Sequence, residues 1–248
     1  MFQIGVVSLI PELVDAVCLY GVVGRAVERR LLGVAYTSPR EFTTDQHRTA
    51  DDRPYGGGPG MVLKYEPLRD AIRAARQRLP AGSRALMLSA HGRLFDQRMA
   101  GELAACPGML LVAGRYEGVD ERVVQSEVSE EVSLGNYVIS GGELAAAVVI
   151  DAVARLVPGV LGDQASFEQD SYMNGLLDHP QYTRPETIDG MQVPEVLVKG
   201  DHEAVRRWRL KQALGRTWLY RPALLGGVHL TEEEQVLLEE FKGEYEIS

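Results

Sequence analysis

The stretch Leu134–Arg155, LGNYVISGGELAAAVVIDAVAR, joins a glycine turn to a segment that is apolar almost all round. Residues 137–139 look like the end of a β-strand, and Ser140-Gly-Gly142 breaks the run. Residues 144–157 then predict a helix with two polar residues in its body, Asp151 and Arg155. A helix without a polar face must be buried, so we expect it in the core or in a subunit interface.

Strand and helix patterns alternate over residues 2–160, working outward from this stretch. Apolar runs predict strands, and apolar residues at helical spacing predict helices. Such alternation is typical of an α/β domain with a parallel sheet covered on both faces. The predicted strands are 2–9, 85–89 and 109–113, and the predicted helices are 11–20, 67–79 and 96–105.

Three glycine-rich turns interrupt or follow these apolar segments, at residues 53–61, 114–118 and 140–142. Ligands of open α/β sheets bind at the carboxyl ends of strands, and glycine lets backbone approach a ligand closely. We therefore expect 114–118 and 140–142 to share one pocket. No Lys-Ser/Thr pair follows the glycines of 56–60, and no G-x-G-x-x-G opens a helix, so neither common nucleotide motif is present. Taken singly, each turn is more often a plain turn than a site.

The last third of the chain predicts a small, mainly helical domain. The polar segment 162–174 is typical of a linker, and helices are expected over 201–214 and from Thr231 onward. Residues 206–221, RRWRLKQALGRTWLYR, hold six basic residues and no acidic one, with aromatic residues between them. Such a stretch can bind phosphates and stack on unpaired bases. The alternative is an ordinary solvated helix face.

Composition excludes several classes of function. The 248 residues carry a formal net charge of -9 with a pI of about 5.1, which argues against broad, non-specific binding to nucleic acid, and we expect no DNA partner. A local basic patch remains compatible with this charge. No apolar run is long enough to predict a membrane span. Cys18 and Cys106 lack metal-ligand spacing and are expected to be reduced thiols of a cytoplasmic protein.

Four long motifs occur in order, and together they resemble one family. They are RPYGGGPGMVL (53–63), AGRYEGVDER (113–122), SLGNYVISGGELAAAVVIDAVAR (133–155) and DSYMNGLLDHPQYTRP (170–185). This set is similar to the bacterial tRNA (guanine-N1)-methyltransferase family, TrmD, of the SPOUT class, over nearly the whole chain. The resemblance implies an α/β fold: a SPOUT-type parallel sheet with a C-terminal trefoil knot, a rare topology, plus a small helical C-terminal domain. The implied boundaries are a catalytic domain at 1–161, a linker at 162–174 and a tRNA-binding domain at 175–248.

The resemblance also implies an activity. It is S-adenosyl-L-methionine-dependent methylation of N1 of the guanine immediately 3′ of the anticodon in tRNA, by a homodimer whose sites are shared between subunits. Asp170 matches the general base at N1, and Arg155 matches the cation near O6. The implied cofactor contacts are Met87, Leu88, Gly114, Leu134, Gly135, Asn136, Tyr137, Val138, Ile139 and Gly141. The implied tRNA contacts are Asp178, Arg184, Arg206, Arg207 and Arg209.

Magnesium is the second cofactor that the resemblance implies, with Glu117 as the nearby carboxylate. One acidic residue is not a metal site, and Mg²⁺ bound largely by waters leaves little trace in a sequence.

Three other functions are weighed beside this one. The first is a SPOUT methyltransferase acting on another RNA, such as ribosomal RNA. The second is a non-catalytic RNA-binding scaffold with a degenerate cofactor pocket, which the presence of Arg155, Asp170 and all three glycine turns argues against. The third is a kinase or ATPase built on residues 56–60, which the missing Lys-Ser/Thr pair argues against.

Overall fold

The computed structural model describes residues 1–162 and 170–247, and the chain divides into two compact units, 1–162 and 163–248. Each unit has its own core. Most of the segment expected to be a linker, 163–169, lies outside the described residues.

The first unit is built on a five-stranded parallel sheet in the order β2-β1-β6-β5-β7. The central strand β6 is buried at every position, as expected for a continuous apolar run in a sheet covered on both faces. The strands are β1 (Phe2–Val7), β2 (Leu32–Thr37), β5 (Arg84–Leu94), β6 (Gly108–Ala113) and β7 (Glu130–Ser133).

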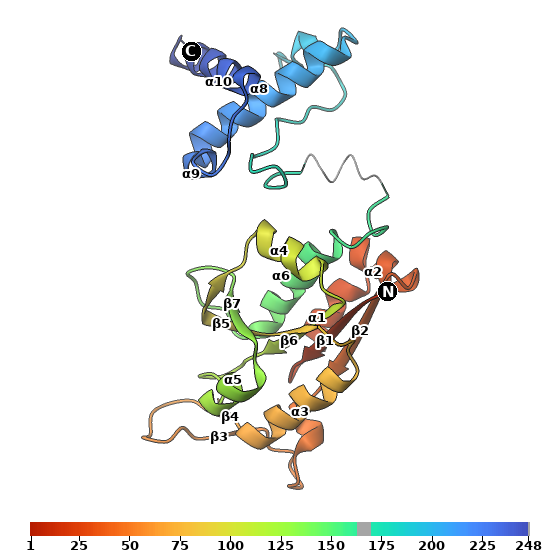
Figure 1. The fold of residues 1–248 in the computed structure, drawn as a ribbon, viewed down its shortest axis with the longest axis vertical. Coiled ribbons are helices and arrows are strands. Elements are labelled where there is room, and N and C mark those ends of the chain that lie inside the picture. Colours follow the sequence, from red (N-terminus) through yellow and green to blue (C-terminus); the bar gives the residue numbers. More distant parts are fainter. Residues whose placement is uncertain (163–169, 248) are drawn as a thin grey trace. The chain divides into compact units, whose positions relative to one another are not determined.

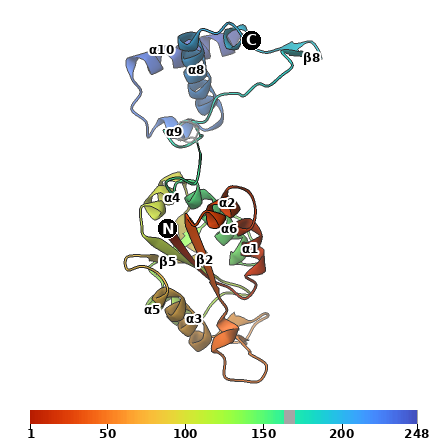
Figure 2. The same ribbon diagram turned by 90° about the vertical axis from the view of Figure 1, so that its right-hand side faces the viewer.

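Helices cover both faces of this sheet, which makes a three-layered unit (Figures 1 and 2). One face packs against α1 (Glu12–Cys18), α2 (Gly21–Glu28), α4 (Gln97–Ala104) and α6 (Gly142–Ala154). The other packs against α3 (Tyr65–Gln77) and α5 (Glu121–Glu127). The predicted α/β class with a parallel sheet is confirmed.

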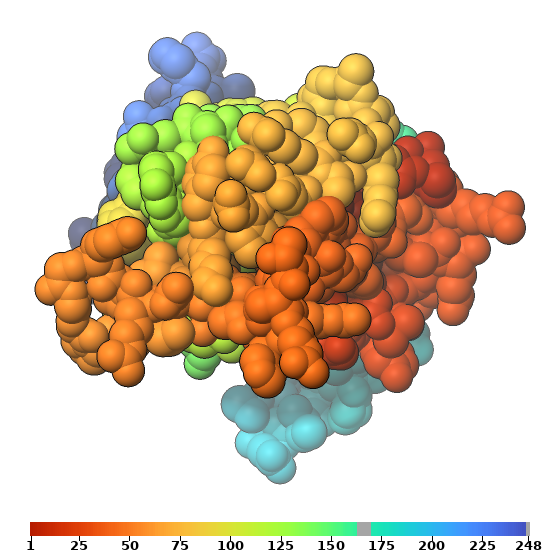
Figure 3. Space-filling view, turned by 90° about the horizontal axis from the view of Figure 1, so that it is seen from below, coloured from red at the N-terminus to blue at the C-terminus, as the bar shows by residue number. Residues whose placement is uncertain are grey.

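Short elements extend the unit between β2 and α3. They are the 3₁₀ helix η1 (Pro39–Phe42) and the two-residue strands β3 (Asp51–Asp52) and β4 (Val62–Leu63), which pair antiparallel. Most of residues 43–60 are exposed. They appear in orange on the face shown in Figure 3.

Helix α6 is buried mainly by its own unit. It packs against α1, α2, α4 and strands β5 and β6, and nine of its residues are buried. Leu144 and Val148 stay about half exposed, at 51% and 50%. They are four residues apart and therefore share one face of the helix, so most of the apolar surface predicted for this helix is core.

Two of the predicted strands differ from the structure. Residues 137–139 form no strand, because the edge strand β7 ends at Ser133 and the chain then leaves the sheet as a loop. Strand β5 is longer than predicted and bulges: Leu88 and Arg93 both register with Val132. The bulge gives residues 89–92 no ladder partner on β7 and turns them away from the regular sheet.

The second unit is mainly helical, as predicted. Its two long helices pack on each other, around a core of Leu176, Leu214, Leu237 and Leu238. Asp201 caps the first helix, and Thr231 and Glu234 form a capping box at the start of the last. The elements are β8 (Thr187–Ile188), β9 (Met191–Gln192), η2 (Glu195–Leu197), α8 (His202–Tyr220), α9 (Pro222–Leu225) and α10 (Glu232–Ile247).

Within residues 1–162 and 170–247, every helix is too short or too polar to cross a bilayer.

Candidate functional site

A cavity of about 430 Å³ opens in the first unit at the carboxyl ends of β5, β6 and β7. Most of its lining comes from three chain segments: residues 87–91 of β5, which include its bulge, the turn after β6 (114–119), and the end of β7 with the loop into α6 (131–142 without Asn136). Glu121 and Val124 of α5 and Ala145 of α6 complete the lining. This is the edge of a parallel sheet at which α/β proteins bind ligands. The predicted sharing of one pocket by the turns 114–118 and 140–142 is confirmed.

The two glycine turns are joined backbone to backbone. Arg115 and Gly141 form an isolated antiparallel bridge, and the Gly142 N–H donates to the Gly114 carbonyl at 2.8 Å. A Cβ on Gly142 would lie 2.8 Å from Ala113 Cα, closer than carbon atoms pack. Glycine is therefore required here for close approach of two chain segments.

The first glycine turn, 53–61, is tied to the same wall. The Glu117 N–H donates to the Met61 carbonyl at 3.0 Å, and the Leu63 N–H donates to the Gly118 carbonyl at 3.0 Å. Gly60 has a φ of +82°, and a Cβ there would lie 2.3 Å from Glu117 Oε1. The structure thus connects all three predicted glycine turns around the turn after β6.

Nine of the ten expected cofactor residues line this cavity. They are Met87, Leu88, Gly114, Leu134, Gly135, Tyr137, Val138, Ile139 and Gly141, and Asn136 is the exception. The loop side chains are apolar and open, and Val138 is 98% exposed. Exposed apolar side chains grouped at a cavity are typical of a surface that a ligand or partner covers.

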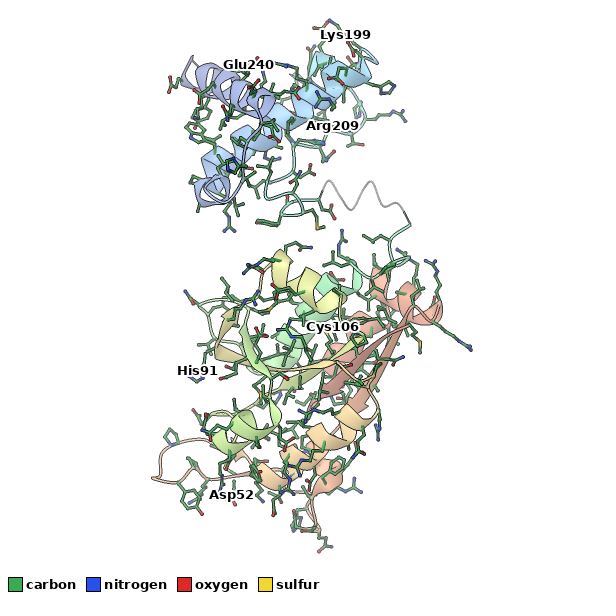
Figure 4. The ribbon with its side chains drawn as sticks, in the orientation of Figure 1. Asp52, His91, Cys106, Lys199, Arg209 and Glu240 are labelled. Atoms are coloured by element: carbon green, nitrogen blue, oxygen red, sulfur yellow. The ribbon has the colours of Figure 1, made fainter. Side chains whose placement is uncertain are left out.

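Several other lining residues carry polar chemistry that the sequence interpretation did not assign. Tyr116 has a left-handed backbone with a φ of +62°, a strained state for a non-glycine residue that is frequent at functional sites. Ser89 donates its hydroxyl to Glu131 across the β5 bulge. His91, labelled in Figure 4, is highly exposed on the same bulge.

A buried cluster of three polar residues lies behind the turns. Glu143, in the first turn of α6, is 0% exposed. Its Oε1 accepts from the Ser8 hydroxyl at 2.8 Å, and both carboxylate oxygens accept from Arg115 Nε at 3.0 Å. Only Arg115 of the three lines the cavity. The sequence does contain a signal for this cluster: Glu143 is a charged residue directly after Gly141-Gly142, at the start of an apolar helix.

The lining of the cavity suits a ligand that has both apolar faces and polar edges. Its walls combine apolar side chains with three glycines, Gly114, Gly135 and Gly141. An adenosine group meets this description, since its ring faces are apolar and its edges need donors and acceptors.

A magnesium ion does not fit these residues as a cage of protein ligands. Across residues 1–162 and 170–247, no group of three or more His, Cys, Asp or Glu side chains could hold a metal ion. Glu117 is exposed at the cavity wall. We therefore assign no chemical step to a metal.

The two expected catalytic residues belong to different units. Arg155 caps the carboxyl end of α6 in the first unit. Asp170 is half-buried in the second unit, where its carbonyl accepts from the Met173 N–H at 3.2 Å.

The expected tRNA-binding arginines of α8 differ in their surroundings. Arg206 Nη2 lies 2.7 Å from Glu233 Oε1, and Arg207 Nη2 lies 2.8 Å from Glu240 Oε1, so both pair with α10. The Arg206 guanidinium also lowers the pKa of the Glu203 carboxyl. Successive helix residues are about 100° apart, so Arg209 and Arg207 lie on opposite sides of α8. Arg209, labelled in Figure 4, is exposed.

An aromatic group joins the two segments of the second unit that were expected to contact tRNA. The rings of His179 and Tyr182 each lie 6.3 Å from the Trp208 ring, centroid to centroid. Asp178 accepts from the His179 N–H and the Gln181 side chain, and Arg184 is exposed. The structure thus places residues 178–184 beside the amino-terminal half of α8.

The chain is similar over almost its whole length to a protein family and to individual relatives. The family model described as "tRNA (Guanine-1)-methyltransferase TrmD" matches residues 2–227. The tRNA (guanine-N(1)-)-methyltransferase of Serratia proteamaculans is 59% identical over 98% of this chain and 95% of the relative. The enzyme of the same name from Aeromonas salmonicida is 60% identical over 96% of each chain. This chain therefore belongs to the TrmD family of tRNA (guanine-N1)-methyltransferases.

Proposed function

We propose that this protein transfers a methyl group from S-adenosyl-L-methionine to N1 of guanine in tRNA, at the guanine immediately 3′ of the anticodon. Family membership at about 59% identity over nearly the whole chain carries the proposal. The cavity at the strand ends, with its glycine-lined and apolar walls, supports it independently.

The methyl donor binds in the cavity of the first unit. The backbone of residues 134–139 and Gly141, of which Asn136 alone does not line the cavity, offers donors and acceptors to the adenine edge. Met87, Leu88 and Gly114 form the other walls. Bound there, S-adenosyl-L-methionine supplies an electrophilic methyl group. The exposed apolar side chains of the loop exclude water from the ligand when it is bound.

Guanine N1 must lose its proton as it gains the methyl group, and negative charge develops toward O6. Asp170 accepts the N1 proton, and Arg155 stabilises the charge at O6. A carboxylate is a weak base for this proton, so the arginine is needed to lower the free energy of the anion. Asp170→Ala and Arg155→Ala are each expected to lower kcat with little effect on cofactor binding.

The second unit holds the tRNA. Arg209 on α8 and the rings of His179, Tyr182 and Trp208 offer a cation and stacking surfaces for phosphate and bases. Arg206 and Arg207 are held by carboxylates of α10, so we assign them a smaller part. Arg209→Ala is expected to weaken tRNA binding more than Arg206→Ala and to lower its salt dependence.

A homodimer with a knotted sheet completes the proposal. The half-exposed Leu144 and Val148 of α6, with Leu13 and Leu19 from α1 and its end, are apolar side chains that a second copy would cover. Family membership also implies a trefoil knot, in which the turn after β6 and the loop from β7 into α6 take part. Sedimentation of wild type and Val148→Glu tests the dimer: the variant is expected to sediment as a monomer.

The deciding experiment uses two tRNA transcripts that differ only in the base 3′ of the anticodon, guanine or adenine. Label transferred from S-adenosyl-L-methionine to the guanine transcript alone would support the proposal. Label in both would place the target elsewhere on RNA. Label in neither, with cofactor binding measured by calorimetry, would indicate another substrate. Absence of cofactor binding would favour the scaffold function.

A further inference from the structure

We infer that Glu143 is a positioning residue for the methyl-donor pocket: it acts through Arg115 to hold the turn after β6 against the turn before α6. This inference rests on the proposed function, because the ligand it concerns is S-adenosyl-L-methionine. The cluster lies outside the set of residues expected to contact that ligand.

The cluster connects three distant parts of the sequence. Ser8 follows β1, Arg115 follows β6, and Glu143 stands in the first turn of α6. Glu143 accepts from both partners, and its place near the helix amino terminus is favourable for a negative charge. Ser8 Oγ in turn accepts from the Ile10 N–H at 2.9 Å. The carboxylate therefore fixes the strand end, the turn and the helix to one another.

Burial makes this arrangement sensitive to the loss of one partner. Glu143 is fully buried and the Arg115 side chain is 19% exposed, so removing the carboxylate leaves a largely desolvated guanidinium without its counter-charge. Arg115 would have to move toward water. Its backbone forms the bridge to Gly141, so movement of Arg115 would displace two segments that line the cavity.

Glu143 lies behind the cavity wall, so its role differs from that of a residue that contacts the ligand. Ser8 and Glu143 do not line the cavity, whereas Gly114, Arg115 and Gly141 do. Glu143 therefore has no direct contact with a ligand in the cavity and reaches the cavity wall through Arg115. A shift of the wall by a fraction of an ångström is enough to weaken binding in a preorganised site.

The test substitutes Glu143→Gln, which keeps the shape and the acceptor for Ser8 but removes the charge. The expected result is a Kd for S-adenosyl-L-methionine raised about tenfold or more, the order set by one charge-assisted hydrogen bond. The KM for the cofactor should rise in parallel, while kcat at saturating cofactor stays close to the wild-type value. Calorimetry gives Kd directly on the full-length protein.

Glu127→Gln is the matched control. Glu127 is also a buried glutamate, 4% exposed, held by the two arginines Arg73 and Arg76 in the same unit. It does not line the cavity. Glu127→Gln is expected to lower thermal stability but leave the cofactor Kd unchanged. An equal rise of Kd in both variants would mean that general loosening of the unit is the cause, and would overturn the inference.

A double-variant cycle tests the route through Arg115. If Glu143 acts through that residue, Glu143→Gln with Arg115→Gln should raise Kd by less than the product of the two single effects. Multiplying single effects, or an unchanged Kd in Glu143→Gln, would refute the inference. A wild-type protein that binds no S-adenosyl-L-methionine would instead refute the proposed function, so the two failures are distinguishable.

Discussion

Replacing Gly142 by alanine probes the closest contact in the site. The added Cβ would lie 2.8 Å from Ala113 Cα, 3.0 Å from the Gly114 nitrogen and 3.2 Å from the Ala113 carbonyl carbon. Carbon atoms pack favourably at about 3.5–4.0 Å, so the chains must separate by roughly 0.7 Å or more. All three contacts are with backbone, which has no rotamer to yield.

The expected cost is that of overpacking a core, about 1–3 kcal/mol. For a unit of this size each kcal/mol lowers Tm by roughly 2–4 °C, so Gly142→Ala should melt roughly 2–12 °C below wild type. The substitution also strains the hydrogen bond from the Gly142 N–H to the Gly114 carbonyl. Cofactor binding should therefore weaken as well, because Gly114 and Gly142 both line the cavity.

Differential scanning calorimetry measures the melting of the first unit, with hydrogen exchange of the 108–113 amides to localise the change. Gly101→Ala is the matched control, since Gly101 lies within α4 and a Cβ there meets nothing within 4 Å. That variant should gain about 0.5–1 kcal/mol from helix propensity. A Gly142→Ala protein that melts at or above wild type would refute the steric reasoning.

Four further predictions concern stability and thiol reactivity. Asp201→Ala removes the side-chain cap of α8 and should cost about 1 kcal/mol by denaturant unfolding. Leu214→Ala in the second core should cost about 2–5 kcal/mol by the same method. Burial raises the pKa of the Cys18 thiol, so native protein should alkylate at Cys106 before Cys18. Because folding raises the pKa of Cys18, the unfolded chain loses this proton first as the pH rises. The free energy of unfolding should therefore fall above the ordinary thiol pKa of about 8.5, seen as a lower denaturant midpoint.

The sheet was predictable where apolar runs are continuous. β1 and β6 are short, apolar and bounded by turn residues, and both lie close to their expected positions. Residues 137–139 misled the interpretation because an apolar cavity wall and an apolar strand have the same composition. The strands β3, β4, β8 and β9 have two residues each, too few to produce a period that a sequence can display.

The loops that line the candidate site could be predicted from the sequence, but the buried contacts of Ser8, Arg115 and Glu143 behind them could not. Glycine turns after apolar runs pointed to the strand ends, where the cavity lies. The pairing of Ser8 with Glu143 spans 135 positions, and no local pattern links residues so far apart. The pairing of Arg206 and Arg207 with α10 could not be predicted from residues 206–221 alone. Their partners Glu233 and Glu240 lie on the acidic helix that follows, and a local pattern does not show which residues of two helices meet.

The order of the strands in the sheet limits how early the first unit can fold during synthesis. β1 lies between β2 and β6, yet β6 begins about 70 residues after β2 ends. At a translation rate of about 5–20 residues per second, several seconds pass between the synthesis of β2 and that of β6. Through that time the edge of β1 that pairs with β6 has no partner. During that interval an apolar, unpaired strand edge is exposed on the nascent chain. That edge of β1 can therefore pair as it does in the finished sheet only after residue 113 has been made.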